Sequence, residues 1–416
     1  MSLNILINTA KEKFKINNEE LLEIIELIKG EDEFTEEYLI SNKVSKDTAK
    51  DLIRLFKDLE LIYIRYSYEC EKDDESEIAM SLKEECSFCK TILQGADQHI
   101  IRELYTLKET LTSEVEVKER LELEEVIDIL YLENFNKLKT EINKNKIVPF
   151  LGSGLSIPLG LPNWTGLIAE MVSGLTDPSE IEQFNEYLKE GDIFNAIDIL
   201  QKESLSYRTE DQIKSFINEY ITTSFREELE DEYHNINDLL KLESDFYITT
   251  NYDNALSHYK KKFSYPFILD DLKELQELYT EKNQRIVHLH GNVEKKDTMV
   301  VTKEDYERLY KDDKNKTILG SMLSLKSFLF IGFSFTDKYF NDIYQLLRSQ
   351  IGGKHYIILA DLNKHKAQQL LDKGLIPISI NVNKLVTEKS FSNEINNEKT
   401  QRFVNSLKII IKYLLK

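Results

Sequence analysis

The chain has 416 residues, of which 41% are hydrophobic and 10% aromatic, and a formal net charge of −20 at pH 7. This length allows two or three domains of about 150 residues each, and the composition excludes a disordered chain. So acidic a balance also excludes a surface that is basic throughout and binds nucleic acid everywhere.

No apolar run reaches the ~18 residues that a membrane-spanning helix needs, so we expect no membrane contact. The first residues lack a basic region followed by a long apolar core, which is the pattern of a secretory signal. The three cysteines, Cys70, Cys86 and Cys89, are too few for a disulfide framework. We therefore expect a cytoplasmic protein.

Residues 1–100 are predicted to form an α+β domain with the layout of a winged helix-turn-helix. Apolar spacing and turn residues indicate three helices and then a β-hairpin. The helices are expected over 17–28, 36–40 and from Ser45 onward, and the two strands over 61–68 and 78–82.

The third of these helices contains four basic residues, Lys46, Lys50, Arg54 and Lys57. They could contact DNA phosphates. Acidic neighbours in the sequence favour docking of a protein partner over DNA, and both interpretations stay open.

Cys86-Ser-Phe-Cys89 is half of a zinc site, and Cys70 and His99 could complete a set of three cysteines and one histidine. The spacing matches no established zinc pattern, and buried free cysteines are common. We therefore expect no metal site, with zinc as the alternative. The charged segment that follows, residues 101–143, has helical apolar spacing and predicts a helical linker.

Residues 144–385 predict a Rossmann-like α/β domain with a mostly parallel sheet. Apolar strands separated by helices are typical of parallel sheets that are buried on both faces. The strands are expected over 146–151, 245–250, 285–289, 327–331, 354–360 and 375–380. Helical spacing between 167 and 242 predicts an insertion, and residues 386–416 are expected to form a C-terminal helix packed on the domain.

Gly152-Ser153-Gly154 follows the first strand. Glycines at such a position allow backbone N–H groups to approach a pyrophosphate closely. Gly-x-Gly alone is a weak pattern, which also fits a plain tight turn. Ile157 stands where the fingerprint of a dehydrogenase has a third glycine or alanine, and this argues against an ordinary dehydrogenase.

Small or polar residues also follow the next three strands: Thr250, Asn251 and Asp253, then His290 and Gly291, then Gly332 and Ser334. Each one alone could be an ordinary turn former or loop residue. Because ligands of open α/β sheets bind beyond the carboxyl ends of the strands, their concurrence predicts a single ligand site.

Taken in chain order, these motifs resemble those of the sirtuins. The matching runs are Gly152-Ser-Gly-Leu-Ser156 with Gly160-Leu-Pro162, Thr250-Asn-Tyr-Asp253, His290-Gly291 and Gly332-Phe-Ser334. More narrowly, Thr249-Thr-Asn-Tyr-Asp253 and Gly332-Phe-Ser-Phe-Thr-Asp337 are similar to motifs of the bacterial sirtuin-like NAD hydrolases of anti-phage defence. The resemblance extends over about residues 145–380, and no single motif carries it.

The resemblance implies that the site cleaves NAD+ into nicotinamide and ADP-ribose. Nicotinamide leaves as a neutral molecule, so the reaction needs support for an oxocarbenium-like transition state and a base for the nucleophile rather than a strong acid. By resemblance, His290 is that base, Asn251 holds the ribose and a water, and Asp253 orients Asn251 or the nicotinamide-side loop. The implied cofactor-binding residues are Gly152, Ser153, Gly154, Ser156, Pro162, Asn163, Trp164, Thr250, Gly332, Ser334 and Asp337.

The chain departs from the sirtuin deacylases in three places. Their four-cysteine zinc module follows the catalytic histidine, whereas no cysteine lies beyond Cys89 here. Trp164-Thr165 stands in place of their Phe-Arg, and His258 lies further from the Asn-x-Asp motif than the histidine that they carry. These departures favour water as the nucleophile, and we expect no catalytic metal.

Two other functions stay open. The chain could be a DNA- or partner-docked regulator that binds NAD or ADP-ribose without turnover, or a deacylase or ADP-ribosyltransferase that lacks the zinc module. A hydrolase that depletes NAD during abortive infection must be gated. The resemblance therefore also implies a homo-oligomer and a defence partner or phage-derived trigger, with the N-terminal domain as the candidate for this control.

Overall fold

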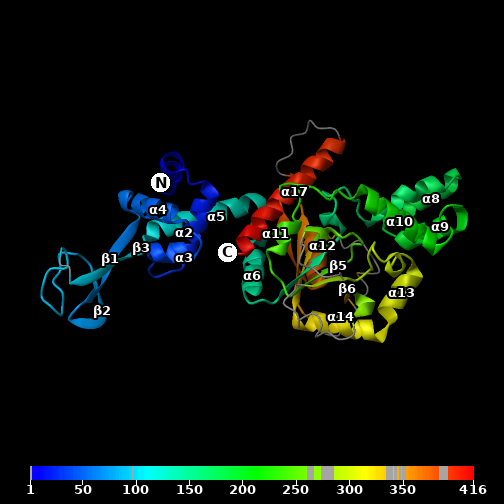
Figure 1. Ribbon diagram of the computed structural model, residues 1–416. Helices are drawn as coiled ribbons and strands as arrows, with labels where there is room; N and C mark the ends of the chain where they lie inside the picture. Colours follow the sequence, from blue (N-terminus) through cyan, green and yellow to red (C-terminus); the bar gives the residue numbers. More distant parts are fainter. Residues whose placement is uncertain are drawn as a thin grey trace. The chain divides into compact units, whose positions relative to one another are not determined.

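The computed structural model describes the chain at residues 2–95, 98–259, 267–272, 285–333, 341, 344, 345, 348, 353–383 and 392–416. The chain divides into two compact units, Met1–Glu122 and Leu123–Lys416 (Figure 1). None of the helices in the described part has the length and the apolar content that are needed to cross a bilayer.

Helices make up the first half of the N-terminal unit. They are α1 (Ser2–Thr9), the π-helical turn η1 (Ala10–Phe14), α2 (Asn18–Lys29), α3 (Glu36–Ser41) and α4 (Lys46–Asp58). The side chains of Asn17, Thr35 and Ser45 accept N–H groups from the first turns of α2, α3 and α4, which fixes where these helices begin. The three predicted helices are therefore present, and α4 buries Leu52 and Phe56 in their shared apolar core.

A three-stranded antiparallel sheet follows, with the strand order β2-β1-β3. Its strands are β1 (Ile62–Cys70), β2 (Asp73–Ala79) and β3 (His99–Leu107). β1 and β2 form a hairpin, as predicted, but the second strand covers Asp73–Ala79 rather than 78–82, so the turn is shorter than expected. The winged-helix interpretation of the unit stays a prediction.

Strand β3 corrects the prediction of a helical linker that starts at residue 101. Charged side chains obscure its alternation in the sequence, where Tyr105 and Leu107 point into the core. Tyr105 also exchanges two backbone hydrogen bonds with Phe34, at 2.8 and 2.9 Å, which ties β3 to the loop between α2 and α3. Helix α5 (Glu109–Val126) begins only after this strand.

The second unit is built on a seven-stranded sheet in which all neighbouring strands are parallel, in the order β10-β9-β8-β4-β5-β7-β6. The strands are β4 (Ile147–Leu151), β5 (Phe246–Thr249), β6 (Phe267–Ile268), β7 (Arg285–His288), β8 (Ser327–Ile331), β9 (His355–Ala360) and β10 (Leu375–Ile380). Every residue of β4 and β5 is buried, as in parallel sheets that are covered on both faces. The predicted Rossmann-like sheet is confirmed.

Helices cover this sheet and form an insertion beside it. They are α6 (Leu132–Asn143), α7 (Trp164–Ala169), α8 (Pro178–Glu190), α9 (Ile193–Glu203), α10 (Glu210–Ser224), α11 (Ile236–Leu240), α12 (Ala255–Tyr259), α13 (Lys303–Lys311), α14 (Asp313–Leu325), α16 (Lys364–Asp372) and α17 (Ser392–Leu414). Helices α7 to α10 enclose an apolar core of their own, and Figure 1 shows α8, α9 and α10 grouped to one side of the sheet. The predicted helical insertion is present.

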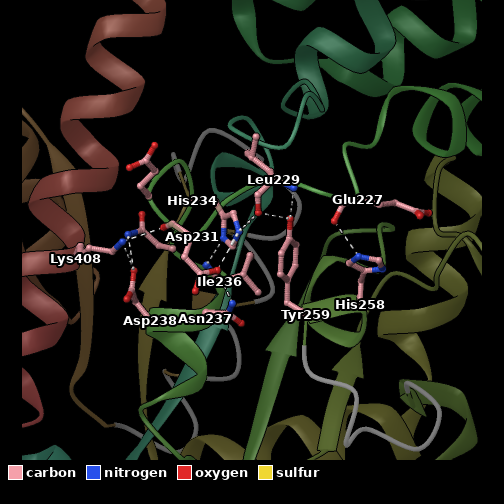
Figure 2. Close-up of polar contacts among 12 residues, drawn as sticks. Glu227, Leu229, Asp231, His234, Ile236, Asn237, Asp238, His258, Tyr259 and Lys408 are labelled. Carbon is pink, nitrogen blue, oxygen red and sulfur yellow. Dashed lines mark hydrogen bonds and ion pairs between the residues drawn. The ribbon is translucent and has the colours of Figure 1, made fainter.

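The C-terminal helix α17 is anchored to α11 and to the segment that precedes it. Lys408 Nζ donates a hydrogen bond to the carbonyl oxygen of Asp231 at 2.9 Å and lies 3.9 Å from Asp238 Oδ2 (Figure 2). The side chain of Asn235 donates to the carbonyl oxygen of Val404, also at 2.9 Å. Contacts at two positions along α17 therefore fix how this helix lies on the unit.

The loops that follow β4 and β8 contact each other through glycines. Gly152 N donates to the carbonyl oxygen of Ile331, and Gly154 N to that of Gly332, each at 2.9 Å. A Cβ atom on Gly152 would lie 2.6 Å from the Gly332 oxygen, and Gly332 itself has a φ of +76°. Only glycine allows this approach. The N–H groups of Gly152 and Gly154, which were expected to bind a pyrophosphate, therefore donate to carbonyl oxygens of the protein itself.

A buried histidine makes the stability of this sheet depend on pH. His355 of β9 is fully buried, and its Nδ1 accepts the N–H of Phe328 from β8 at 2.9 Å. Burial, together with the nearby positive charge of Arg348, lowers the pKa of His355 to about 4. The ring is therefore neutral in the folded unit at pH 7.

We predict that acid destabilises the unit partly through His355. An unfolded histidine takes up a proton near pH 6.5, whereas the folded ring resists protonation down to about pH 4. Protonation of His355 therefore leaves the free energy of unfolding unchanged above pH 6.5. Below pH 6.5 it lowers the free energy of unfolding by up to about 1.4 kcal/mol per pH unit. Urea unfolding from pH 7 to pH 4.5 should show a shallower pH dependence in His355→Gln, which keeps an acceptor for Phe328.

The exposed His365 provides the matched control. His365→Ala should keep the pH dependence of the wild type. An equal dependence in His355→Gln and the wild type would contradict the assignment.

Candidate active site

A cavity of about 460 Å³ lies at the carboxyl ends of the central strands of the second unit. Its wall includes the loops after β4, β5 and β8, the end of β9, and one face of α17. Strand β5 is the neighbour of β4 on one side, and β8, which comes later in the chain, is the neighbour of β4 on the other side. The cavity therefore occupies the topological switch point, where open α/β sheets bind their ligands, and its size suits a small organic molecule.

Most of the residues predicted for the site line this cavity. They are Ser153, Gly154, Ser156, Pro162, Asn163, Trp164, Thr250, Asn251, Asp253, His290 and Gly332. Gly152 is not part of the lining and instead supports the contact between the β4 and β8 loops. Ser334 and Asp337 lie outside the described residues.

Asn251 is held at its side chain by a short chain of hydrogen bonds. Its Nδ2 donates to Ser156 Oγ at 3.1 Å, and Ser156 Oγ donates in turn to Asp253 Oδ2 at 2.8 Å. Asn251 Oδ1 is buried and has no hydrogen-bond partner among the described residues. Because buried carbonyl oxygens are almost always paired, this oxygen is available to a ligand hydroxyl or a water.

Hydrogen bonds to the Ser156 hydroxyl link the carboxyl group of Asp253 to the side chain of Asn251. The other carboxyl oxygen of Asp253 accepts the N–H of Ala255 at 3.0 Å, which fixes the carboxyl group at the start of α12. Burial raises the pKa of this carboxyl above its usual range, while the hydrogen bonds from Ala255 and Ser156 oppose the rise. The geometry thus supports one of the two roles that the resemblance implies for Asp253, the orientation of Asn251.

His288 holds the backbone of Asn251. Its Nδ1 lies 2.9 Å from the carbonyl oxygen of Asn251, which can only accept, so Nδ1 carries the proton. Burial lowers the pKa of His288 to about 4, so the ring is neutral at pH 7. Asn251 is therefore fixed both at its main chain and at its side chain.

His290 lies in the cavity wall between two tyrosines. Its Nε2 is 2.6 Å from the Tyr310 hydroxyl, and its Nδ1 is 3.4 Å from the Tyr306 hydroxyl. Burial lowers the pKa of His290 to about 3, so the imidazole is uncharged at neutral pH and one of its nitrogens can accept a proton or a hydrogen bond. Sequence reasoning missed both tyrosines, although their spacing of four residues places them on one face of α13.

The loop after β4 and helix α7 supply a more rigid part of the wall. Asn163 caps α7 by accepting the N–H of Gly166 at 2.8 Å, and the Trp164 ring meets the Tyr252 ring edge-on at 5.7 Å. His258 is not among the described residues of the cavity wall, and its Nε2 lies 2.9 Å from the carbonyl oxygen of Glu227 (Figure 2).

Helix α17 adds residues that no local pattern indicates. Lys399, Thr400, Phe403 and Val404 lie in the cavity wall. Lys399 is the one lysine or arginine in the described lining, and its charge suits an anionic ligand such as a phosphate. It lies more than 240 residues beyond the glycine loop, so only the fold brings the two together.

The sequence of this unit is similar to that of known proteins. Residues 245–378, from β5 to β10, match the family model of the SIR2-like domain. The NAD(+) hydrolase ThsA of Enterococcus faecium is 30% identical over 233 residues, which are 54% of this chain and 45% of that protein. ThsA of Bacillus cereus (strain MSX-D12) is 30% identical over 240 residues, 55% of this chain and 46% of that protein.

A third relative, the NAD(+) hydrolase ThsA of Cytobacillus dafuensis, is 27% identical over 239 residues, 55% of this chain and 44% of that protein. The match thus spans less than half the length of these curated relatives. The sirtuin-like resemblance inferred from the motifs is confirmed to this extent: residues 245–378 of the parallel-sheet unit match the SIR2-like domain model, and about half of the chain is similar in sequence to the NAD(+) hydrolases named ThsA.

Proposed function

We propose that the protein is an NAD+ hydrolase that cleaves NAD+ into nicotinamide and ADP-ribose. The observation that carries the proposal is a cavity at the switch point of a SIR2-like domain in which Asn251 offers an unpartnered oxygen beside the neutral His290. The relatives named NAD(+) hydrolase support the same reaction.

The cavity offers complementary surfaces for the parts of NAD+. We assign the pyrophosphate to Ser153 and Lys399, because the N–H groups of Gly152 and Gly154 are already paired with carbonyl oxygens and the Ser156 hydroxyl links Asn251 to Asp253. The nicotinamide ribose is assigned to the end of β5, at Thr250 and Asn251. The adenosine end is assigned to Gly332 and Phe333 after β8, and Ser334 and Asp337 follow them in the sequence.

The proposed chemistry follows from the charges in the site. The nicotinamide ring of NAD+ is cationic, so a neutral His290 does not repel it, whereas an imidazolium would. As the bond from C1′ to nitrogen breaks, nicotinamide takes the bonding electron pair and leaves neutral. Asn251 Oδ1 holds a ribose hydroxyl or the attacking water, and His290 accepts the water proton as the new C1′–O bond forms.

We predict that Asn251→Ala and His290→Ala lower the rate of nicotinamide release at least about 100-fold, because each removes a group that acts on the ribose or the water. The assay uses a fluorogenic NAD+ analogue, with and without lysate from infected host cells. His258→Ala is the control, because this histidine lies outside the cavity wall and should leave turnover intact.

Three results would contradict the proposal. NAD+ that is bound but not turned over under any condition would favour the regulator. Release that depends on an acylated peptide would favour a deacylase. Undiminished turnover in both variants would place the chemistry elsewhere.

We predict a different pattern for Ser156→Ala, which removes the link between Asn251 and Asp253. The unpaired amide and carboxyl groups should cost roughly 1–3 kcal/mol of stability. The turnover number should also fall, by roughly tenfold, because Asn251 loses its fixed orientation. Ser244 is a matched control: it is equally buried, and its hydroxyl donates to the carbonyl oxygen of Ile147 at 3.1 Å.

Ser244→Ala should lower the melting temperature without changing the turnover number. A Ser156→Ala enzyme with wild-type turnover would show that Ser156 is merely structural.

We further propose that the hydrolase is gated, as a homo-oligomer in anti-phage defence, and that the N-terminal unit docks the controlling partner. The exposed residues Lys46, Lys50 and Arg54 recur every four residues on α4, opposite its buried face. Lys57 is not available on this surface, because its Nζ pairs with Glu103 at 2.6 Å. This row supports an anionic partner, either DNA or an acidic protein surface.

A gel-shift experiment with duplex DNA separates these partners. If DNA is the partner, the full chain should bind in a salt-dependent manner, and replacing Lys46, Lys50 and Arg54 together by alanine should abolish the shift. Replacing Lys364 and Lys366 on α16, which are equally exposed, should leave it unchanged. Weak binding that the triple variant retains would remove the DNA interpretation in favour of a protein partner.

A further inference from the structure

The tip of the N-terminal hairpin has a core of its own that is very small. Its buried residues are Tyr68, Cys70, Ala79, Cys86 and Leu93, and they form a cluster separate from the helical core of the unit. The connection between β2 and β3 is long and contains no helix or strand in its described residues. A core of this size rarely holds such a loop without a disulfide or a metal.

Four potential metal ligands meet inside this small cluster. The ligand atoms of Cys70, Cys86, Cys89 and His99 all lie within 4.8 Å of one another. With Zn–S bonds of about 2.3 Å and Zn–N bonds of about 2.0 Å, the ligand atoms of a tetrahedral zinc are roughly 3.5–3.8 Å apart. Cys89 Sγ and His99 Nε2 are 3.2 Å apart, so small shifts would admit the ion.

The fold brings the four ligands together from distant points of the sequence. Cys70 and His99 are directly opposite each other in the ladder of β1 and β3. Cys86 and Cys89 belong to a tight turn, in which Cys86 N donates to the Thr91 oxygen at 2.8 Å and Lys90 N donates to the Cys86 oxygen at 3.0 Å. The turn presents both thiols to the ladder.

A second network holds the turn in place. Tyr68 donates a hydrogen bond from its hydroxyl to Glu77 at 2.7 Å, and the N–H of Ser87 donates to the same hydroxyl at 3.3 Å. The side chain of Ser87 also donates to Glu77. Ser87 is the residue next to Cys86, so β1 and β2 orient the cysteine turn independently of any metal.

The histidine ring is not committed to another polar group. His99 Nδ1 is buried without a hydrogen-bond partner among the described residues, and Nε2 faces the Cys89 sulfur. The Tyr68 ring packs edge-on against the imidazole, with ring centroids 6.0 Å apart. The imidazole thus lies against the Tyr68 ring with one ring nitrogen within 4.8 Å of all three sulfurs.

We propose that Cys70, Cys86, Cys89 and His99 bind one structural Zn2+ ion, which closes the tip of the hairpin. Three thiolates and an imidazole are soft ligands that suit zinc and not Mg2+ or Ca2+. All four positions of the tetrahedron are protein ligands, which is typical of structural rather than catalytic sites. The three cysteines are free thiols, so no disulfide competes for them in this structure. The site is independent of NAD+ hydrolysis.

The test measures zinc in the full chain purified without chelator from cells grown with added zinc. Mass spectrometry should find about one zinc per chain, and less than about a tenth of that in Cys86→Ser and His99→Ala. His365→Ala replaces an exposed histidine and should keep the wild-type content. Replacing zinc by Co2+ should give the visible absorption of a tetrahedral cobalt–thiolate centre.

A second measurement does not depend on how the variants fold. Treating the wild-type protein with a strong zinc chelator should expose the connection between β2 and β3 to limited proteolysis, and adding zinc back should protect it again. The proposal would be overturned by a wild-type chain that contains no zinc, or by variants that keep the wild-type zinc content. A disulfide between the cysteines that persists in reducing buffer, in place of the metal, would also overturn it.

Discussion

The parallel-sheet unit depends on the close contact between the loops that follow β4 and β8. Because β4 and β8 are neighbours at the point where the chain changes sides, their loops must separate to leave room for a ligand. They nevertheless stay in contact at their bases, where the backbones of Gly152 and Gly332 approach too closely for any side chain. The cavity above them can therefore be both open and rigid. Larger residues at either position would push the two loops apart and change the width of the site.

Above this contact, hydrogen bonds join the ends of three neighbouring strands. Ser156 from the β4 loop binds both Asn251 and Asp253 from the β5 loop, and His288 from β7 binds the main chain of Asn251. The arrangement leaves two buried atoms of the group, Asn251 Oδ1 and His288 Nε2, without a hydrogen-bond partner among the described residues. Since buried polar atoms are almost always paired, unpaired atoms next to a cavity indicate a ligand site rather than an ordinary buried polar cluster.

The sequence predicts the parts of this site that depend on local pattern, and not the parts that depend on tertiary contacts. Runs of buried apolar residues indicate the strands, and polar residues after them indicate the edge where Asn251 and His290 meet. Tyr306 and Lys399 could not be assigned in the same way, because nothing in the local sequence around a helical tyrosine or lysine shows that it lines a cavity. Strand β3 was missed for a related reason, since Arg102 and Glu103 lie on opposite faces of the strand and interrupt the apolar alternation.

The four proposed zinc ligands are a second set of residues that the sequence alone does not bring together. Their spacing along the chain matches no standard pattern, and the two halves of the set are joined only through the register of β1 with β3. A one-residue slip of that register would turn Cys70 or His99 to the opposite face and destroy the site. The metal would in turn hold the register, because it couples the ladder to the cysteine turn.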